Sequence, residues 1–358
     1  MEVLKVMTIL GTRPEIIRLS RIIPKLDVLC DHVLVHTGQN YDKTLNDIFF
    51  KDLQLRQPDV KIDSKSPTLG GQLAKIFEGV EQALLRHKPD KVLILGDTNT
   101  SLCTVLVERL GFPVYHMEAG NRCFDMKVPE EKNRRIIDCV SSFNLPYTPG
   151  SRENLIREGC DKQRIFETGN PIYEVLMHYM PQISECQTPK DPYILVTAHR
   201  AENVDDPHRL HRIMCTLEHI ATHSTYNVIF SCHPRTRRRL QEYGIEYSIT
   251  LSEPMGFFQF VSLELNAEIV ITDSGTVQEE CCILEVPTVT IRDSTERPET
   301  VECGSNIISG LEYEDMLRCF QMADLKTSLK RPRWKFPAGY IEERVSSRVV
   351  HFLLGNQL

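Results

Sequence analysis

Short runs of aliphatic and β-branched residues alternate with longer amphipathic stretches along almost the whole chain. In the first half, the runs predicted to be strands are Val3–Leu10, His32–Thr37, Lys91–Leu95 and Val114–Met117. The pattern restarts after Asp191, with Tyr193–Val196, Asn227–Ser231, Ile245–Leu251, Glu268–Thr272 and Pro287–Ile291. Strands separated by helices form parallel sheets covered by helices. We therefore predict an α/β protein with two doubly wound, Rossmann-like domains.

The length of the chain also favours two domains, because 358 residues exceed what one ordinary core holds. Tyr179–Pro192 carries three prolines among polar residues, which is typical of a linker. We predict an N-terminal domain over 1–170 and a C-terminal domain over 171–339. The segment 340–358 has apolar residues at helical spacing, and we expect a helix that packs back across the domains.

Charge and composition narrow the possible partners. A net charge of -7 offers no general attraction for nucleic acid or membranes, and no apolar run approaches the roughly 20 residues that span a bilayer. The apolar N-terminal stretch is short and leads directly into a Gly turn, so we expect a first strand rather than a signal peptide. None of the twelve cysteines forms a C-x-x-C pair, which favours reduced thiols and a soluble, cytoplasmic protein.

The end of the first predicted strand carries the residues of an anion site. Gly11 lets a ligand approach the backbone closely, Pro14 suits the first turn of a helix, and Arg13 and Arg18 lie on that turn and the next. An ordinary strand-to-helix turn with surface arginines explains the same residues.

Acidic residues follow at three further positions in this half. Asp97 comes after an aliphatic strand in GDTNT, and Glu118 comes after the next strand in HMEAG. Glu130 opens a predicted helix in PEEKNRR, with Arg134 one turn later. Helix capping and the helix dipole would each favour such acids without any chemistry. Three acids on neighbouring elements nevertheless predict an acid–base site.

The second half repeats the arrangement with cationic and small residues. His199 and Arg200 follow the first strand of this half, and His233 follows the next. Ser274 stands between a strand and a helix in DSGTVQEE, with Glu280 in the second turn of that helix. Backbone N–H groups at such a helix start suit a diphosphate, and Glu280 suits the two hydroxyls of a ribose. An ordinary capped helix start is the alternative.

Seven motifs occur in one order between residues 11 and 299: GTRPE, GDTNT, HMEAG, PEEKNR, TAHRAEN, DSGTVQEE and RDSTERPE. Together they resemble the non-hydrolysing UDP-N-acetylglucosamine 2-epimerase family. The resemblance implies the glycosyltransferase-B architecture, with two Rossmann-like domains facing across a cleft that closes on a UDP-sugar. It also implies a homodimer, and an isomerase that needs neither a metal nor any other cofactor.

The resemblance implies a role for each matching position. Asp97, Glu118 and Glu130 would be the active-site carboxylates, and His199 a catalytic or phosphate-facing residue. The substrate-binding residues would be Arg13, Arg18, Arg134, His233, Phe260, Ser274, Gly275 and Glu280, with Phe260 stacking on uracil. Two positions depart from the family pattern: Arg18 replaces a lysine, and Thr276 replaces a second glycine of the phosphate loop.

Further stretches are similar to a narrower branch, the UDP-N-acetyl-L-fucosamine synthases, which epimerise C2 of UDP-2-acetamido-2,6-dideoxy-L-talose. They are HTGQNYDKTLNDIFF, GNRCFDMKVPEEKNRR, LPYT and GNPIYEVLMHYMPQI. Residues 121–124 (NRCF) replace the Leu-Arg-Thr or Leu-Arg-Ser usual after EAG in the UDP-N-acetylglucosamine enzymes. The alternatives are a glycosyltransferase of the same architecture, a hydrolysing epimerase and a non-catalytic UDP-sugar sensor.

Overall fold

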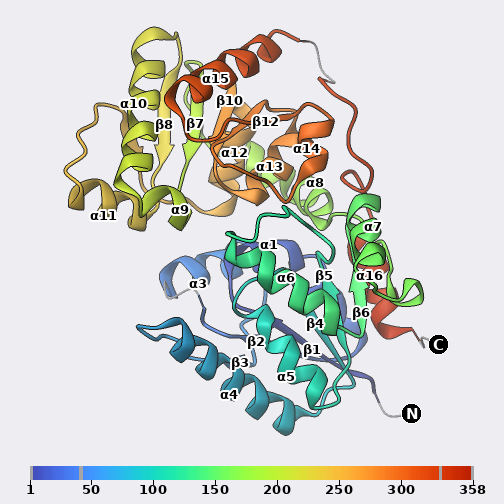
Figure 1. Cartoon of the computed structure of the whole chain (residues 1–358). Coiled ribbons are helices and arrows are strands. Elements are labelled where there is room, and N and C mark those ends of the chain that lie inside the picture. The colour runs from blue at the N-terminus through green and yellow to red at the C-terminus, as the bar shows by residue number, and fades with distance from the viewer. Residues whose placement is uncertain (1–2, 40–42, 330–332, 356–358) are drawn as a thin grey trace. The chain divides into compact units, whose positions relative to one another are not determined.

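The computed structural model describes residues 3–39, 43–329 and 333–355, and it divides into two compact units. The first unit comprises Met1–His178 and Ala338–Leu358, and the second comprises Tyr179–Pro337. Part of the HTGQNYDKTLNDIFF stretch, the start of the Pro-rich RPRWKFP segment and the last residues of the predicted tail helix lie outside the described residues. Figure 1 shows the twisted parallel sheet of each unit with helices on both faces.

The first unit contains a parallel sheet of six strands in the order β3-β2-β1-β4-β5-β6. The strands are β1 (Lys5–Leu10), β2 (Asp31–His36), β3 (Val60–Lys61), β4 (Lys91–Leu95), β5 (Val114–Met117) and β6 (Phe143–Leu145). The inner strands are buried on both faces and read as nearly continuous aliphatic runs, as expected for a parallel sheet covered by helices.

Helices cover this sheet on both sides. They are α1 (Arg13–Leu19), α2 (Ile23–Leu29), α3 (Lys43–Asp52), α4 (Leu69–His87), α5 (Thr104–Arg109), α6 (Pro129–Val140), α7 (Pro149–Arg157), the first part of α8 (Pro171–Ser184) and α16 (Val345–Leu354), with short 3-10 turns at Ser101–Cys103 and Lys162–Arg164. The apolar stripe of α4 packs with Met7 and Ile9 of β1 in one core, which also includes Val107 of α5. The helical spacing of Ile76, Val80, Ala83 and Leu84 explains this packing.

The C-terminal segment belongs to the first unit. Helix α16 packs on α2, where the ammonium of Lys25 donates to the hydroxyls of Ser346 and Ser347. Lys91 of β4 donates to the carbonyls of Leu353 and Gly355, at 2.6 and 2.9 Å. These contacts tie the last helix to the sheet of the first unit.

The second unit has a parallel sheet in the order β12-β11-β10-β7-β8-β9. Its strands are β7 (Tyr193–Thr197), β8 (Asn227–Ser231), β9 (Thr250–Ser252), β10 (Ile269–Thr272), β11 (Thr288–Thr290) and β12 (Asn306–Ile308). Its helices are the end of α8, α9 (Ala201–Val204), α10 (Pro207–His223), α11 (Pro234–Glu242), α12 (Phe257–Asn266), α13 (Gly275–Leu284), α14 (Pro298–Glu302) and α15 (Tyr313–Thr327).

Numbered from its own first strand, each sheet follows the same order, 3-2-1-4-5-6, which is the order of the Rossmann fold. The direction of the strand order reverses between β1 and β4 in the first sheet and between β7 and β10 in the second. Open parallel sheets bind ligands beyond the carboxyl ends of the strands at this reversal. The predicted fold class, two Rossmann-like α/β units, is therefore confirmed.

Some element bounds differ from the predicted ones. Helix α8 begins at the expected domain boundary after residue 170, but the first unit continues into this helix as far as His178. Glu174 accepts a 2.8 Å hydrogen bond from the backbone of Ser346 and so joins the start of α8 to the first unit. Much of the expected linker is the end of this helix, where Tyr179 packs on Phe257 and Phe258. Within the described ranges, every helix is too short or too polar to span a membrane.

Candidate active site

Three neighbouring strands of the first sheet, β1, β4 and β5, carry predicted site residues at their carboxyl ends. Gly11 follows β1, Asp97 lies two residues after β4, and Glu118 directly follows β5. The turns are linked, because the backbone N–H of Gly96 donates to the carbonyl of Met117 at 3.1 Å. The structure thus brings these three predicted positions to one edge of the sheet.

Each of two carboxylates at this edge pairs with an arginine on a helix. The guanidinium of Arg18 on α1 pairs with Glu118, and both side chains are buried. Arg134 on α6 lies 2.8 Å from Asp97. Glu130 is half-buried in the first turn of α6, one helical turn before Arg134. Glu130 therefore lies one helical turn from the arginine that pairs with Asp97.

Glu118 is held in an uncommon backbone conformation. Its φ of 67° lies in the left-handed region, which side-chain-bearing residues rarely adopt. Gly120 follows with a φ of 81°, and a Cβ atom there would lie 2.1 Å from the carbonyl oxygen of Ser151. Only glycine fits at this position. The backbone thus turns sharply after β5 and aims the Glu118 carboxylate at Arg18.

Two buried acids that were not predicted hold this turn in place. Asp138 on α6 accepts from the N–H of Gly120 at 3.1 Å and pairs with His116 and Arg122. Burial opposes the charge on Asp138, but the hydrogen bonds and charges of His116 and Arg122 outweigh it and lower the pKa of the Asp138 carboxyl. No local pattern marks Asp138, because it meets the turn only after the chain has folded.

Glu131, the second such acid, neighbours the predicted Glu130. It is fully buried and accepts from the backbone N–H groups of Cys123 and Phe124, at 3.0 and 3.3 Å, and from Arg134 at 3.2 Å. Of the two acids that open α6, Glu131 holds the 121–124 loop, while Glu130 remains at the surface edge. The helix dipole favours an acidic residue at either position, so the sequence alone could not distinguish the roles of Glu130 and Glu131.

Glu15 closes the turn at the start of α1. Its carboxylate accepts from the backbone N–H groups of Gly11 and Thr12, at 2.6 and 3.1 Å, and from the hydroxyl of Thr98 at 2.8 Å. Burial raises the pKa of Glu15 to about 7 against the opposing effect of these hydrogen bonds. Arg13, the other predicted cation of this turn, is half-buried with its guanidinium 5.8 Å from the centre of the Phe49 ring.

The second sheet repeats the arrangement at the carboxyl ends of three neighbouring strands, β10, β7 and β8. His199 follows β7, His233 follows β8, and Ser274 follows β10. The rings of His199 and His233 are 5.9 Å apart. Fully buried Asp273 accepts from the backbone N–H groups of His199 and Arg200, each at 2.9 Å, so it fixes the turn after β7. Asp273 directly precedes the predicted Ser274, but sequence reasoning did not assign it this role.

The start of α13 is tightly packed. The N–H of Ser274 donates to the hydroxyl of Thr272 at 2.9 Å, and a Cβ atom on Gly275 would lie 2.4 Å from the carboxylate of Glu296. Glu296 in turn pairs with Arg292 at 2.9 Å. Glycine at position 275 therefore allows Glu296 to pack against the start of this helix.

Two further predicted residues lie on α12 and α13. Phe260 is half-buried on α12, and Glu280 is buried on α13. Glu264, also on α12, is completely buried, and its carboxyl group shares a hydrogen bond with that of Glu280. Burial and the charge of neighbouring Glu280 raise the pKa of Glu264 well above its usual value.

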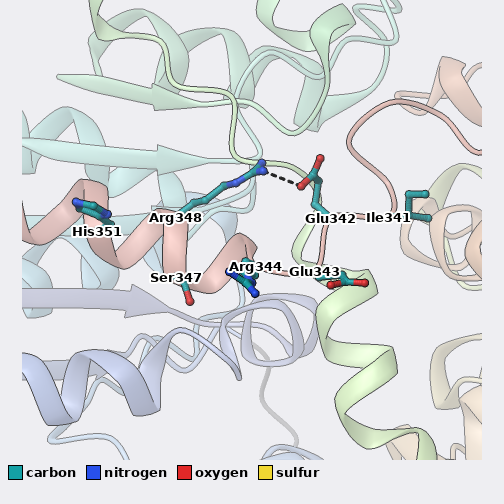
Figure 2. Close-up of a pocket in the computed structure, with 7 residues that line it drawn as sticks. All are labelled: Ile341, Glu342, Glu343, Arg344, Ser347, Arg348 and His351. Atoms are coloured by element: carbon teal, nitrogen blue, oxygen red, sulfur yellow. Dashed lines mark ion pairs between the residues drawn. The ribbon is translucent and has the colours of Figure 1, made fainter.

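A separate pocket of about 510 Å³ lies along the C-terminal segment of the first unit. Figure 2 shows its lining from α16 and the residues before it, with an ion pair of 2.9 Å between Arg348 and Glu342. None of its lining residues is a predicted site residue. The described part of the chain holds no group of three or more His, Cys, Asp or Glu side chains placed to bind a metal ion.

Comparison with known proteins identifies the family of proteins to which the residues at these two sheet edges belong. A family model described as UDP-N-acetylglucosamine 2-epimerase matches residues 26–354. The chain belongs to the UDP-N-acetylglucosamine 2-epimerase family. The predicted resemblance is thereby confirmed, and the protein is an isomerase that acts on UDP-sugars.

The similarity to known relatives covers nearly the whole length of this chain. The UDP-N-acetylglucosamine 2-epimerase of Methanocaldococcus jannaschii is 40% identical, covering 98% of this chain and 99% of its own. Its crystal structure in complex with UDP-GlcNAc and UDP has a TM-score of 0.91, with 98% and 99% of the two chains covered. A UDP-2,3-diacetamido-2,3-dideoxy-D-glucuronate 2-epimerase of Pseudomonas aeruginosa is 33% identical over 98% of this chain and 99% of its own.

Proposed function

We propose that this epimerase inverts C2 of a UDP-linked 2-acetamido sugar by eliminating UDP and adding it back. The observation that carries the proposal is the placement of Asp97 and Glu118 at neighbouring strand ends, with Glu130 at the start of the adjoining helix. Inverting a C–H centre requires a group that removes the proton and a group that returns one to the opposite face. Three carboxylates at one edge supply such groups.

The C2 proton has no neighbouring carbonyl group, so direct removal at neutral pH is too slow. In the proposed reaction the C1–O bond to UDP breaks first, and C1 gains oxocarbenium character. A carboxylate then removes the acidified C2 proton, which leaves a 2-acetamidoglycal and UDP. Proton delivery to the opposite face of C2 and attack of the UDP oxygen on C1 complete the inversion.

The first unit is proposed to act on the sugar. Arg134 and Arg18 hold Asp97 and Glu118 in position through ion pairs, and Arg13 is proposed to contact the diphosphate. The left-handed backbone at Glu118 is an outlier of the kind that clusters at active sites.

The second unit is proposed to hold the UDP. The N-terminus of α13, with Ser274 and Gly275, offers backbone N–H groups to the diphosphate. Glu280 would accept from the ribose hydroxyls and Phe260 would stack on uracil, while His199 and His233 would face the charge that develops on the leaving diphosphate.

Two sugars are candidates for the substrate. The Methanocaldococcus jannaschii relative is named for UDP-N-acetylglucosamine, which favours that sugar and UDP-N-acetylmannosamine as its product. The 121–124 loop favours UDP-2-acetamido-2,6-dideoxy-L-talose, with UDP-N-acetyl-L-fucosamine as its product. Phe124 on this loop is 65% exposed and Met126 is 49% exposed, and such an apolar surface suits a sugar whose C6 is a methyl group. We infer that the 6-deoxy-L-talose sugar is the better substrate.

Incubation of the purified chain with each UDP-sugar in deuterated water tests the reaction and the substrate together. The expected result is C2 inversion without any added acceptor, with deuterium at C2 of the product. The substrate is the sugar with the higher kcat/KM. A requirement for an acceptor would indicate a glycosyltransferase, and release of free sugar would indicate a hydrolase. A product with only protium at C2 would contradict the elimination route.

Substitution of each carboxylate tests the assignment of roles. Asp97→Asn, Glu118→Gln and Glu130→Gln should each lower kcat by about 100-fold or more, the usual size of a general acid–base contribution. UDP binding, measured by calorimetry, should persist. Glu153→Gln removes an exposed carboxylate of the same unit and serves as the control. Near-normal turnover in all three variants would reject the assignment.

A further inference from the structure

Two cysteines of the second unit have their sulfur atoms in contact. Cys282 lies near the end of α13, Cys303 directly follows α14, and their Sγ atoms are 3.8 Å apart. Cys282 is fully buried, whereas Cys303 is half-buried. Both are free thiols. A disulfide requires about 2.0 Å between the sulfurs, so small side-chain and backbone shifts separate this pair from bond formation.

The surroundings of Cys303 make it the more reactive of the two thiols. Its sulfur lies 3.4 Å from the hydroxyl oxygen of Ser305, and the ammonium of Lys326 donates to the neighbouring carbonyl of Gly304. The hydrogen bond with Cys282 is the largest of the effects that lower the pKa of the Cys303 thiol to about 6, with Ser305 and Lys326 adding to it and burial opposing it. The thiolate is the form that attacks peroxides and disulfides.

We propose that Cys282 and Cys303 form a peroxide-sensitive pair that closes to an intramolecular disulfide. The Cys303 thiolate attacks one oxygen of hydrogen peroxide, and the O–O bond breaks. Protonation of the departing hydroxide gives water and leaves a sulfenic acid on Cys303. The Cys282 thiol then attacks the sulfenic sulfur and loses its proton, and a second water leaves. Two thiols are oxidised and one peroxide is reduced to two waters.

The position of the pair determines what the disulfide would hold together. It would join the end of α13 to the end of α14 and close the chain between them, which contains β11 and the Arg292–Glu296 ion pair. Constraining this loop restricts the unfolded chain more than the folded one and so stabilises the second unit. The indole N–H of Trp334 donates to the backbone carbonyl of Cys282 at 3.0 Å, so Trp334 fluorescence reports on this region.

Peptide mass spectrometry under non-reducing conditions tests the proposal on the full-length chain. After treatment with hydrogen peroxide, peptides containing Cys282 and Cys303 should be joined, with a mass about 2 Da below their sum, and the chain should stay monomeric on a non-reducing gel. The urea midpoint reported by Trp334 should move to a higher concentration, and dithiothreitol should reverse both changes. A peroxide-treated protein without this joined peptide, or with Cys303 joined to another chain, would overturn the proposal.

Three variants separate the roles of the two sulfurs. Cys303→Ser should abolish the joined peptide. Cys282→Ser keeps a hydrogen-bond donor beside the Cys303 sulfur but removes the second thiol, so it should leave a sulfenic acid on Cys303 that dimedone traps. Cys215→Ser removes an exposed cysteine of the same unit and should change neither result. Labelling of Cys215 by dimedone faster than Cys303 in the Cys282→Ser protein would contradict the assigned reactivity.

Discussion

Replacing Glu15 by glutamine should change how the stability of the first unit depends on pH. The folded protein can accommodate the amide, because its oxygen can accept from the N–H groups of Gly11 and Thr12 while its NH₂ group donates to the hydroxyl of Thr98. The substitution thus keeps the shape of the turn and removes only the titration. Glu15→Gln is therefore a cleaner probe than alanine, which would leave buried donors without acceptors.

The size of the effect follows from the shifted pKa. Burial raises the pKa of Glu15 from 4.5 to about 7, so the folded protein binds this proton more tightly than the unfolded chain does. The stability contributed by protonated Glu15 is therefore complete below pH 4.5 and is lost as the pH rises to about 7. At about 1.36 kcal/mol per pKa unit, the loss is about 3 kcal/mol. The glutamine variant has no such loss.

Urea unfolding between pH 5 and pH 8 measures this difference. The only tryptophan of the chain, Trp334, lies in the second unit, so its fluorescence identifies the transition of that unit. The remaining change in circular dichroism reports the first unit. From pH 5 to pH 8, Glu15→Gln should gain about 2.5 kcal/mol of unfolding free energy relative to the unsubstituted protein, because part of the total loss has already occurred at pH 5. The exposed Glu153→Gln control should gain nothing. Parallel curves for Glu15→Gln and the unsubstituted protein would refute the reasoning.

Two further substitutions test the buried acid and the strained turn. Glu264→Gln should stabilise the second unit relative to the unsubstituted protein, increasingly above pH 4.5, by about 1.4 kcal/mol per pH unit while Glu264 stays protonated in the folded protein. Urea unfolding followed by Trp334 fluorescence at pH 5, 6 and 7 measures this dependence of the stability difference on pH. A stability difference that does not change with pH would contradict the prediction. Gly120→Ala should destabilise the first unit by about 3 kcal/mol or more, because its Cβ atom meets a backbone oxygen. Gly111 also has a positive φ, but no atom lies near the position of an added Cβ, so Gly111→Ala should destabilise the first unit by only about 1 kcal/mol. Equal losses of stability for the two variants in circular dichroism melts would exclude the clash as the cause.

The strands that position the site could be predicted from the sequence because each is long, aliphatic and followed by small or polar residues. β4, β5 and β8 begin and end where the pattern places them. The strands at and near the edges escaped prediction, since β3 has two residues and β6 and β12 have three, too few to show a period. The run Ile245–Leu251 was predicted as one strand, but only its end enters β9. Its apolar residues fit a strand or a packed loop equally well.

Among the site residues, too, some could be predicted from the sequence and others could not. Those at strand ends could be predicted, because parallel strands bring their carboxyl ends to one edge wherever the intervening helices lie. The acids that hold the turns, Glu131, Asp138 and Asp273, could not. Asp138 comes twenty residues after Glu118, and its partners are fixed only by the packing of α6. The starting residue of α16 also differed: the helix begins at Val345 and not at Tyr340.

The return of residues 338–355 to the first unit has a consequence for synthesis on the ribosome. The carboxylate-bearing unit lacks α16 until Val345–Leu354 have been translated, and by then every residue of the second unit has already been translated. The 159 residues between the two parts of the first unit take roughly 8–32 s at about 5–20 residues per second. During that interval Lys25 and Lys91 are without their α16 partners. The segment made first is therefore completed last, and loss of the final helix would damage the unit at the opposite end of the sequence.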